Sequence, residues 1–204
     1  MLDPKSRASV SISWGVPAEK NDSEFKTFVC FGVPRGGTSA IGGVIRKLGI
    51  FMGENVPNNH EDQEMIGRPI PKRLEVIKRR NESQKIWGWK DPNAVNYLHQ
   101  LAPHLRNPHY IIVTRDVIAT TKGHMRWHAR EAKFSIGDIS VQQQRNFMFA
   151  LSCEAPVMMV SYEKAILNPK SLLAEMTEFL RCPYPEDEAS YVDFLAPGAY
   201  KDAV

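Results

Sequence analysis

A short segment near the start of the chain carries residue types that bind phosphate-like anions. Gly32-Val33-Pro34-Arg35-Gly36-Gly37-Thr38-Ser39 combines an arginine with closely spaced glycines and two hydroxyl groups. Glycines let the backbone turn tightly, and the N–H groups at a helix start, together with the helix dipole, attract an anion. The segment nearly matches the phosphate-binding pattern GxxxxGK[ST], but Thr38 stands at the lysine position. It predicts an anion site, with an ordinary glycine turn as the alternative. The missing lysine disfavours a kinase or ATPase.

Two further basic residues stand at the ends of short apolar runs. Lys90 follows the run 86–89, and Arg115 follows the run 110–114. An arginine can give a phosphate two parallel hydrogen bonds, and a lysine can neutralise an anion or support a carboxylate. The structural alternatives are an ion pair between Arg115 and Asp116, and a turn after Lys90 that only caps the next helix.

These residues must be positioned by strands and helices that alternate along the chain. Short runs rich in β-forming residues indicate buried strands at 27–33, 86–89, 110–114 and 157–161. Helical patterns are expected over 38–48 with Gly49 as the cap, from about residue 93, over 116–130, and from Pro169 after the N-cap residue Asn168. Continuous apolar strands between helices predict an α/β fold with a parallel sheet covered on both faces. Ligands bind such sheets at the carboxyl ends of the strands.

The domain organisation follows from the same pass along the chain. Residues 1–25 are polar and aperiodic, which predicts a loose arm anchored by Trp14. Residues 26–182 are expected to form a single domain, and 183–204 a tail that packs on it.

The motifs together resemble a known family. Pro34-Arg35-Gly36-Gly37-Thr38-Ser39 is similar to the loop that holds the 5′-phosphosulfate in sulfotransferases using 3′-phosphoadenosine 5′-phosphosulfate (PAPS). Trp87–Pro92 resembles the family's Trp-Lys-Asp-Pro signature, and Tyr162–Pro169 its late Tyr-Glu-x-Leu-x-x-x-Pro segment, which we interpret as architectural. The resemblance implies the phosphate-loop NTPase-like sulfotransferase fold, PAPS as the sulfuryl donor, and no metal.

The resemblance also implies roles for single residues. Arg115 corresponds to the family's 3′-phosphate arginine, and the family expects a serine eight residues later, where this chain has Gly123. Thr120 or Thr121 is the candidate replacement, and we assign the role to Thr121. Donor binding is expected from Arg35, Gly36, Gly37, Thr38 and Ser39. Arg35 and Lys90 are expected to stabilise charge on the leaving oxygen.

Transfer to a hydroxyl also requires a general base, which sulfotransferases draw from His, Glu or Asp. Related enzymes often carry a Glu-Asp pair at this distance from the loop, which makes Glu61 the first candidate, with Asp62 and His60 behind it. The alternative is that this acidic run forms only a solvated face or a helix start.

A second group of candidates lies after Arg115. His124 and His128 are four residues apart and so share a helix face, with Trp127 beside them as a stacking surface. A third metal ligand is not evident. The group predicts either a wall of the acceptor site or an ordinary exposed helix face.

Composition limits the function classes. The chain has 204 residues, 43% of them hydrophobic, and a net charge of +3, which excludes a disordered tail and a dedicated nucleic-acid binder. Its three cysteines have no metal-type spacing, and Cys30 lies in an apolar run, which predicts a buried reduced thiol. There is no signal-peptide pattern and no run of about 20 apolar residues, which predicts a cytoplasmic protein without membrane contact.

These observations lead to one expected function and two alternatives. We expect an enzyme that transfers a sulfuryl group from PAPS to a hydroxyl or amine of a small-molecule or carbohydrate acceptor. We expect no nucleic-acid or membrane partner, and the sequence leaves open whether the chain forms a homo-oligomer. The alternatives are a nucleotide or sugar kinase of the same superfamily, and a nucleotide-binding module that has lost catalysis.

Overall fold

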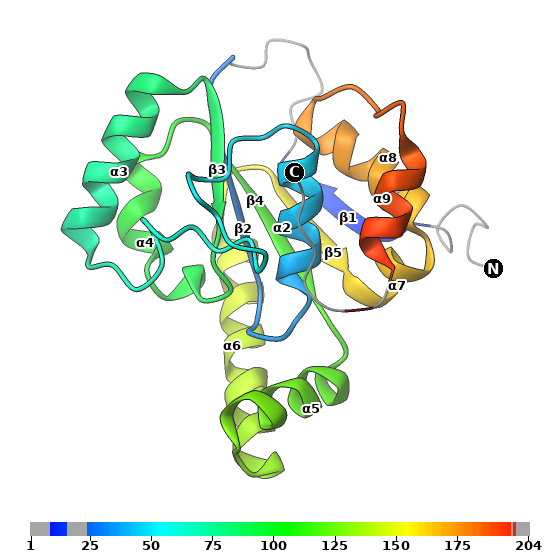
Figure 1. Ribbon diagram of the computed structural model, residues 1–204. Helices are drawn as coiled ribbons and strands as arrows, with labels where there is room; N and C mark the ends of the chain where they lie inside the picture. Colours follow the sequence, from blue (N-terminus) through cyan, green and yellow to red (C-terminus); the bar gives the residue numbers. More distant parts are fainter. Residues whose placement is uncertain (1–8, 16–23, 197, 199–204) are drawn as a thin grey trace.

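A single sheet organises the part of the chain that the computed structural model describes, residues 9–15, 24–196 and 198 (Figure 1). Within these residues five strands form the order β1-β5-β4-β2-β3. All neighbours are parallel except β1, which runs antiparallel to β5. The bounds are β1 Ser11–Trp14, β2 Lys26–Phe31, β3 Ile86–Lys90, β4 Pro108–Thr114 and β5 Val157–Ser161. The predicted α/β fold with a mostly parallel sheet is confirmed.

The register brings the carboxyl ends of the four parallel strands to one edge of the sheet. Cys30 of β2 lies opposite Lys90 of β3, and Thr114 of β4 lies opposite Ser161 of β5. The segments that carry the candidate residues therefore all leave the sheet on the same side, as expected for a ligand-binding edge.

The two faces of the sheet bury separate apolar clusters, because successive side chains of a strand point to opposite sides. Phe28 and Cys30 pack with α2 (Thr38–Lys47), α8 (Pro169–Leu180) and α9 (Glu188–Leu195). Val29 and Phe31 pack with α3 (Ile70–Ser83), α4 (Leu98–Leu101) and α6 (Ala132–Ser152). The remaining helices are α5 (Val117–His128) and α7 (Tyr162–Leu167). In Figure 1, α5 and the start of α6 project beyond the carboxyl ends of the strands.

Three predicted helices are confirmed. Helix α2 begins at Thr38, and Gly49 follows its end with a φ of 88°. Helix α5 begins after Asp116, whose side chain accepts a hydrogen bond from the Ala119 amide. Helix α8 has Asn168 at the N-cap and Pro169 at the first helical position.

The segment after β3 differs from the expected helix. It forms a 3₁₀ turn over Ala94–Asn96, the short helix α4, and a second 3₁₀ turn over Ala102–His104. Pro103 lies near the start of that second turn, and a proline lacks the N–H that an α-helix interior requires. The region is helical, but it is broken into short pieces.

The N-terminal segment also differs from the expectation of a loose arm. Residues 11–14 form β1 against β5. The Val10 amide donates to the Glu175 carboxylate, and the Ser161 amide donates to the Val10 carbonyl. The strand has only four residues and its middle is exposed, so its sequence carries little apolar signal. The other arm residues, 1–8 and 16–23, and the tail residues 197 and 199–204 lie outside the described part of the chain.

Helices α3, α6 and α9 are not among the elements that the sequence predicts. In α6 the apolar side chains of Phe134, Val141 and Met148 are exposed, so the helix has no single apolar stripe. In the described residues, no helix has both the length and the apolarity that crossing a bilayer requires.

Cys30 makes a testable case for the buried thiol. Its side chain is fully buried in β2, and desolvation raises its pKa to about 12, while Cys153 and Cys182 are partly exposed. Because the thiolate is the reactive form, iodoacetamide at pH 8 should alkylate Cys30 more than about tenfold more slowly than the other two. Peptide mass spectrometry over time checks this. Equal rates would show that the Cys30 side of the core opens readily.

Candidate functional site

A cleft of about 880 Å³ lies at the carboxyl edge of the sheet. Its walls come from the loop between β2 and α2, residues 58–61, the end of β3, the start of α5, Tyr162 at the start of α7, and the end of α9. Among the described residues that line it, one is acidic, Glu61, and five are basic: Arg35, Lys90, Arg115, Lys122 and Arg126. The cleft is thus strongly cationic, as a site for a multiply charged anion requires.

The loop between β2 and α2 has the tight geometry that its glycines predict. Arg35 and Gly37 have φ values of 65° and 87°, and the Gly36 amide donates to the Val33 carbonyl at 2.8 Å. No side chain caps the start of α2 in the described structure, which leaves its first N–H groups available to a ligand. Arg35, Gly37, Thr38 and Ser39 line the cleft, whereas Gly36 shapes the turn behind it.

Gly37 gives a sharp test of this loop. A Cβ at Gly37 would collide with the Tyr162 ring, whereas a Cβ at Gly49, with nearly the same φ, would meet nothing within 4 Å. Gly49→Ala should therefore cost only the left-handed backbone strain of about 1–2 kcal/mol. Gly37→Ala should cost more and should also abolish binding of the phosphate-bearing ligand that the loop is expected to hold, because the loop must shift. Urea unfolding and calorimetry compare the two variants. Equal stabilities and intact binding in both would contradict the close packing of Gly37 on Tyr162.

The Arg35 side chain lies against α5. Its guanidinium group stacks over the Trp127 ring at 5.1 Å, and its carbonyl accepts a hydrogen bond from Arg115 Nη1 at 2.9 Å. A Cβ at Gly123 would lie 3.1 Å from the Arg35 Cβ. The glycine at the position where the family has a serine therefore makes room for the stem of Arg35.

Arg115 reaches the same cleft from the end of β4. Its guanidinium group lies 4.7 Å from the centre of the Tyr162 ring, and its Nε lies 3.7 Å from the Glu163 carboxylate. The contacts of Tyr162 with Gly37 and Arg115 agree with its interpretation as architectural, and this side chain also lines the cleft.

The two threonines proposed as replacements for the missing serine do not line the cleft. Thr121 is buried and its hydroxyl donates to the Val117 carbonyl, one turn earlier in α5. Thr120 is also buried and donates to the Asp116 carbonyl in the same way. Both hydroxyls are therefore used inside the helix, and the structure does not bring Thr121 to the other candidate residues.

Lys90 and Glu61 form the polar centre of the cleft. Lys90 Nζ donates to Glu61 Oε1 at 2.8 Å, to Ser39 Oγ at 3.2 Å and to the Asn59 carbonyl at 3.2 Å. Lys90 is 1% exposed, and its burial lowers its pKa, an effect that Glu61 opposes. One ammonium group, that of Lys90, thus bonds both the anion loop and Glu61, the predicted base, and holds the Glu61 carboxylate in place.

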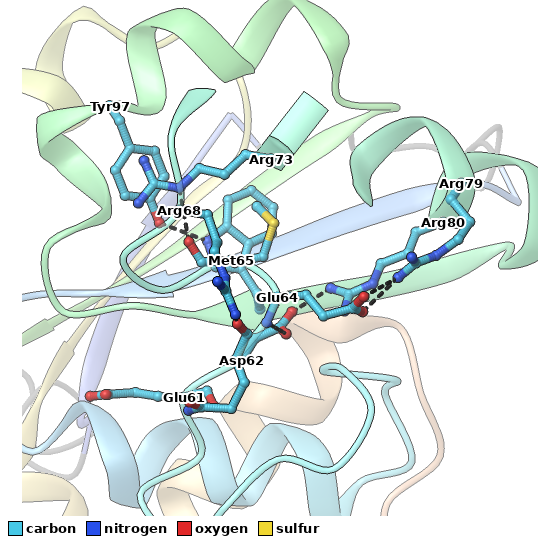
Figure 2. A network of polar contacts seen from close by, with 11 residues as sticks. Glu61, Asp62, Glu64, Met65, Arg68, Arg73, Arg79, Arg80 and Tyr97 are labelled. Atoms are coloured by element: carbon cyan, nitrogen blue, oxygen red, sulfur yellow. Dashed lines mark hydrogen bonds and ion pairs between the residues drawn. The ribbon is translucent and has the colours of Figure 1, made fainter. Parts of the chain in front are cut away.

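The two other candidate bases from the same segment have different surroundings. Asp62 is fully buried and forms an ion pair with Arg80 of α3 (Figure 2). His60 lines the cleft but is 1% exposed, and its ring packs 5.9 Å from that of Phe194 in α9. Of the three, Glu61 has the accessible carboxylate, with a quarter of its side chain exposed.

The histidine pair on α5 reaches the cleft through one of its members, His128. The rings of His124 and His128 are 4.4 Å apart, and His128 lines the cleft with Trp127. His124 Nδ1 lies 3.2 Å from Ser135 Oγ, and burial together with His128 lowers the His124 pKa. Within the described residues, no group of three His, Cys, Asp or Glu side chains could hold a metal ion.

Sequence reasoning missed several residues that build this site. Phe194 and Leu195 close one wall from α9, and Asn146 of α6 holds the Gly32 carbonyl at 2.6 Å. These side chains come from helices with weak sequence signals, and their roles depend on contacts across the whole chain. For Tyr162 a signal existed, because it directly follows a parallel strand as Lys90 and Arg115 do.

The sheet, the glycine loop and the cleft at the strand ends together define the fold of sulfotransferase domains. The sulfotransferase domain from the curacin biosynthetic pathway has a similar structure, with a TM-score of 0.58 at 12% sequence identity, over 88% of this chain and 82% of that one. The sulfotransferase domain from the Synechococcus PCC 7002 olefin synthase has a TM-score of 0.53 at 14% identity, over 86% and 79%. No protein-family model and no curated protein matches the sequence. The likeness confirms the fold that the sequence resemblance implied.

Proposed function

We propose that the protein is a PAPS-dependent sulfotransferase that acts on a hydroxyl or amine of a small-molecule or carbohydrate acceptor. The observation that supports this most directly is Lys90, which contacts both Ser39 of the anion loop and the Glu61 carboxylate. A sulfuryl transferase needs a cation beside the donor and a proton acceptor beside the incoming nucleophile. One buried ammonium group links the two requirements here.

The residues of the cleft fit the donor. Gly37 lies where any Cβ would collide with Tyr162, so the loop backbone is held close and its amides stay accessible at the start of α2. The Nε of Arg115 is buried and has no hydrogen-bond partner among the described residues. Arg35, Arg115 and the α2 amides would hold the phosphate groups of PAPS, which supplies the sulfuryl group when bound.

The chain's own groups have distinct roles in this proposal. Glu61 takes the proton of the acceptor hydroxyl, and Lys90 holds the carboxylate in place through its ion pair. Arg35 and Lys90 stabilise the charge that develops on the leaving oxygen. Arg115 binds rather than catalyses: it reaches the cleft beside Tyr162, and the family resemblance gives it the 3′-phosphate of the donor.

Calorimetry separates this function from a kinase of the same superfamily. Adenosine 3′,5′-bisphosphate should bind with a micromolar dissociation constant, about −8 kcal/mol, and more tightly than ATP. Tighter binding of ATP would favour the kinase, and the absence of bisphosphate binding would refute the sulfotransferase.

A transfer assay separates an enzyme from a binding module that has lost catalysis. With ³⁵S-labelled PAPS and a panel of alcohols, amines and sugars, we expect labelled product from at least one class. The Glu61→Gln protein is the matched control, because it keeps the size of the side chain and loses the proton acceptor. Bisphosphate binding without transfer to any acceptor would support the binding module.

A further inference from the structure

Two neighbouring carboxylates in the segment between α2 and α3 point in opposite directions. Glu61 extends toward Lys90 in the cleft, and Asp62 turns into the protein toward Arg80 of α3. Figure 2 shows the Glu61 side chain directed away from the guanidinium groups of Arg79 and Arg80. Glu61 and Asp62 are joined by one planar peptide bond. Fixing the backbone at the buried Asp62 therefore limits the directions in which the Glu61 side chain can point.

Asp62 is held by contacts at both carboxylate oxygens and at its carbonyl. One carboxylate oxygen pairs with Arg80, the other accepts the Glu64 amide at 3.0 Å, and the Asp62 carbonyl accepts the amides of Met65 and Ile66. The carboxylate also sits against Gly53, where a Cβ would come within 2.8 Å of it. The position of residue 62 is thus fixed by electrostatics and by shape.

Arg80 is an unusual anchor for a surface loop. It is 2% exposed, it bonds Glu64 at 2.8 Å as well as Asp62, and its guanidinium group lies over the rings of Phe51 and Trp87. A buried arginine is costly unless it is paired, so a simple apolar contact would have anchored the loop with less desolvation. The pair specifies one conformation of the loop, which an apolar contact would not do.

We propose that Arg80 is a positioning residue for the general base: through Asp62 it holds the Glu61 carboxylate against Lys90. This inference rests on the proposed function, since it assigns a catalytic consequence to the Lys90–Glu61 geometry. Binding of the donor phosphates does not depend on Arg80, because Arg35 and Arg115, which are proposed to hold them, come from other segments and contact Trp127 and Tyr162.

The first test compares the same substitution at neighbouring positions. Arg80→Lys should lower kcat about 10–100-fold, as expected when a catalytic group is misplaced by about an ångström, and should leave the bisphosphate dissociation constant within about twofold. Arg79→Lys should change neither quantity, because Arg79 is exposed and pairs with Glu64 at the surface. Equal kcat values for the two variants would overturn the proposal.

A double-mutant cycle shows whether Arg80 acts through Glu61. In a Glu61→Gln background, Arg80→Lys should cause little further loss, because the group that it positions is already absent. If the two losses multiply, Arg80 acts by another route and the proposal is wrong. Should Arg80→Lys fail to fold, Asp62→Asn takes its place in the cycle, since it keeps the size of the side chain.

A second readout does not need activity. Acetic anhydride labelling, followed by peptide mass spectrometry, reports the accessibility of single lysines. Arg80→Lys should increase labelling of Lys90 relative to Lys26, which is also buried but lies at the opposite end of the sheet. Unchanged labelling, or an equal increase at both lysines, would overturn the proposal. A wild-type protein that transfers no sulfuryl group refutes the proposed function instead, and the labelling result still decides the positioning.

Discussion

Lys90→Met should lower sulfuryl-transfer turnover about 10²–10³-fold and leave the protein folded. The ammonium group contacts Ser39 of the anion loop, the Asn59 carbonyl and Glu61, so its loss removes a cation from the donor and orientation from the base. The charge is already disfavoured by burial, as the lowered pKa of Lys90 shows. The Glu61 carboxylate that stays behind is a quarter exposed and can be hydrated, so a methionine of similar length should be tolerated in the fold.

The control for this experiment is the same substitution at Lys85. This lysine immediately precedes β3, is 69% exposed, and pairs with Glu24 at the surface. Lys85→Met should leave turnover and melting temperature unchanged, since exposed pairs contribute little. Full turnover in Lys90→Met would show that Glu61 needs no cation beside it. A melting temperature far below wild type would show that the Lys90 contacts are chiefly structural.

Arg35→Ala should abolish detectable transfer and weaken bisphosphate binding at least about tenfold. Arg35 is the basic residue of the anion loop, and its stacking on Trp127 and its contact with Gly123 hold the guanidinium group at the cleft. Single-turnover kinetics and calorimetry give the two quantities separately. Arg115→Ala should differ by mainly weakening binding, with a smaller effect on the chemical step.

Two further variants make the Arg35 result specific. Arg35→Lys retains the charge and loses the planar group that stacks on Trp127, so we expect binding to recover more than turnover. Arg68→Ala removes an exposed arginine that bonds only the Gln63 carbonyl in the described structure, and should change nothing. Wild-type turnover in Arg35→Ala would exclude this residue from the transfer step.

The core of the fold was predictable because its signals are local. Each parallel strand is a short apolar run, and α8 begins with an Asn-Pro pair that is typical of a helix start. Strand β1 was not predictable, because four residues at a sheet edge leave no pattern to read. Helix α6 was not predictable because its apolar residues face both the solvent and the core, so they form no single apolar stripe.

The candidate site also has a part that the sequence could predict and a part that only the fold shows. Arg35 and the glycines form one contiguous motif, so the anion loop could be found from the sequence alone. Glu61 and Asp62 are adjacent and chemically alike, and only the fold separates a carboxylate in the cleft from one buried against Arg80. The wall formed by Phe194 could not be anticipated, because its partner His60 is more than a hundred residues away.

The place of α9 has a consequence for the order in which the molecule assembles. This helix supplies Phe194 and Leu195 to the cleft, and its Tyr191 hydroxyl donates to the Lys47 carbonyl, 144 residues earlier in the chain. Contacts of such long sequence separation form late, because closing a large loop costs chain entropy before any packing is gained. A refolding chain should therefore acquire its parallel sheet before its cleft has both walls. The ability to recognise a ligand would then be among the last properties that the folding chain gains.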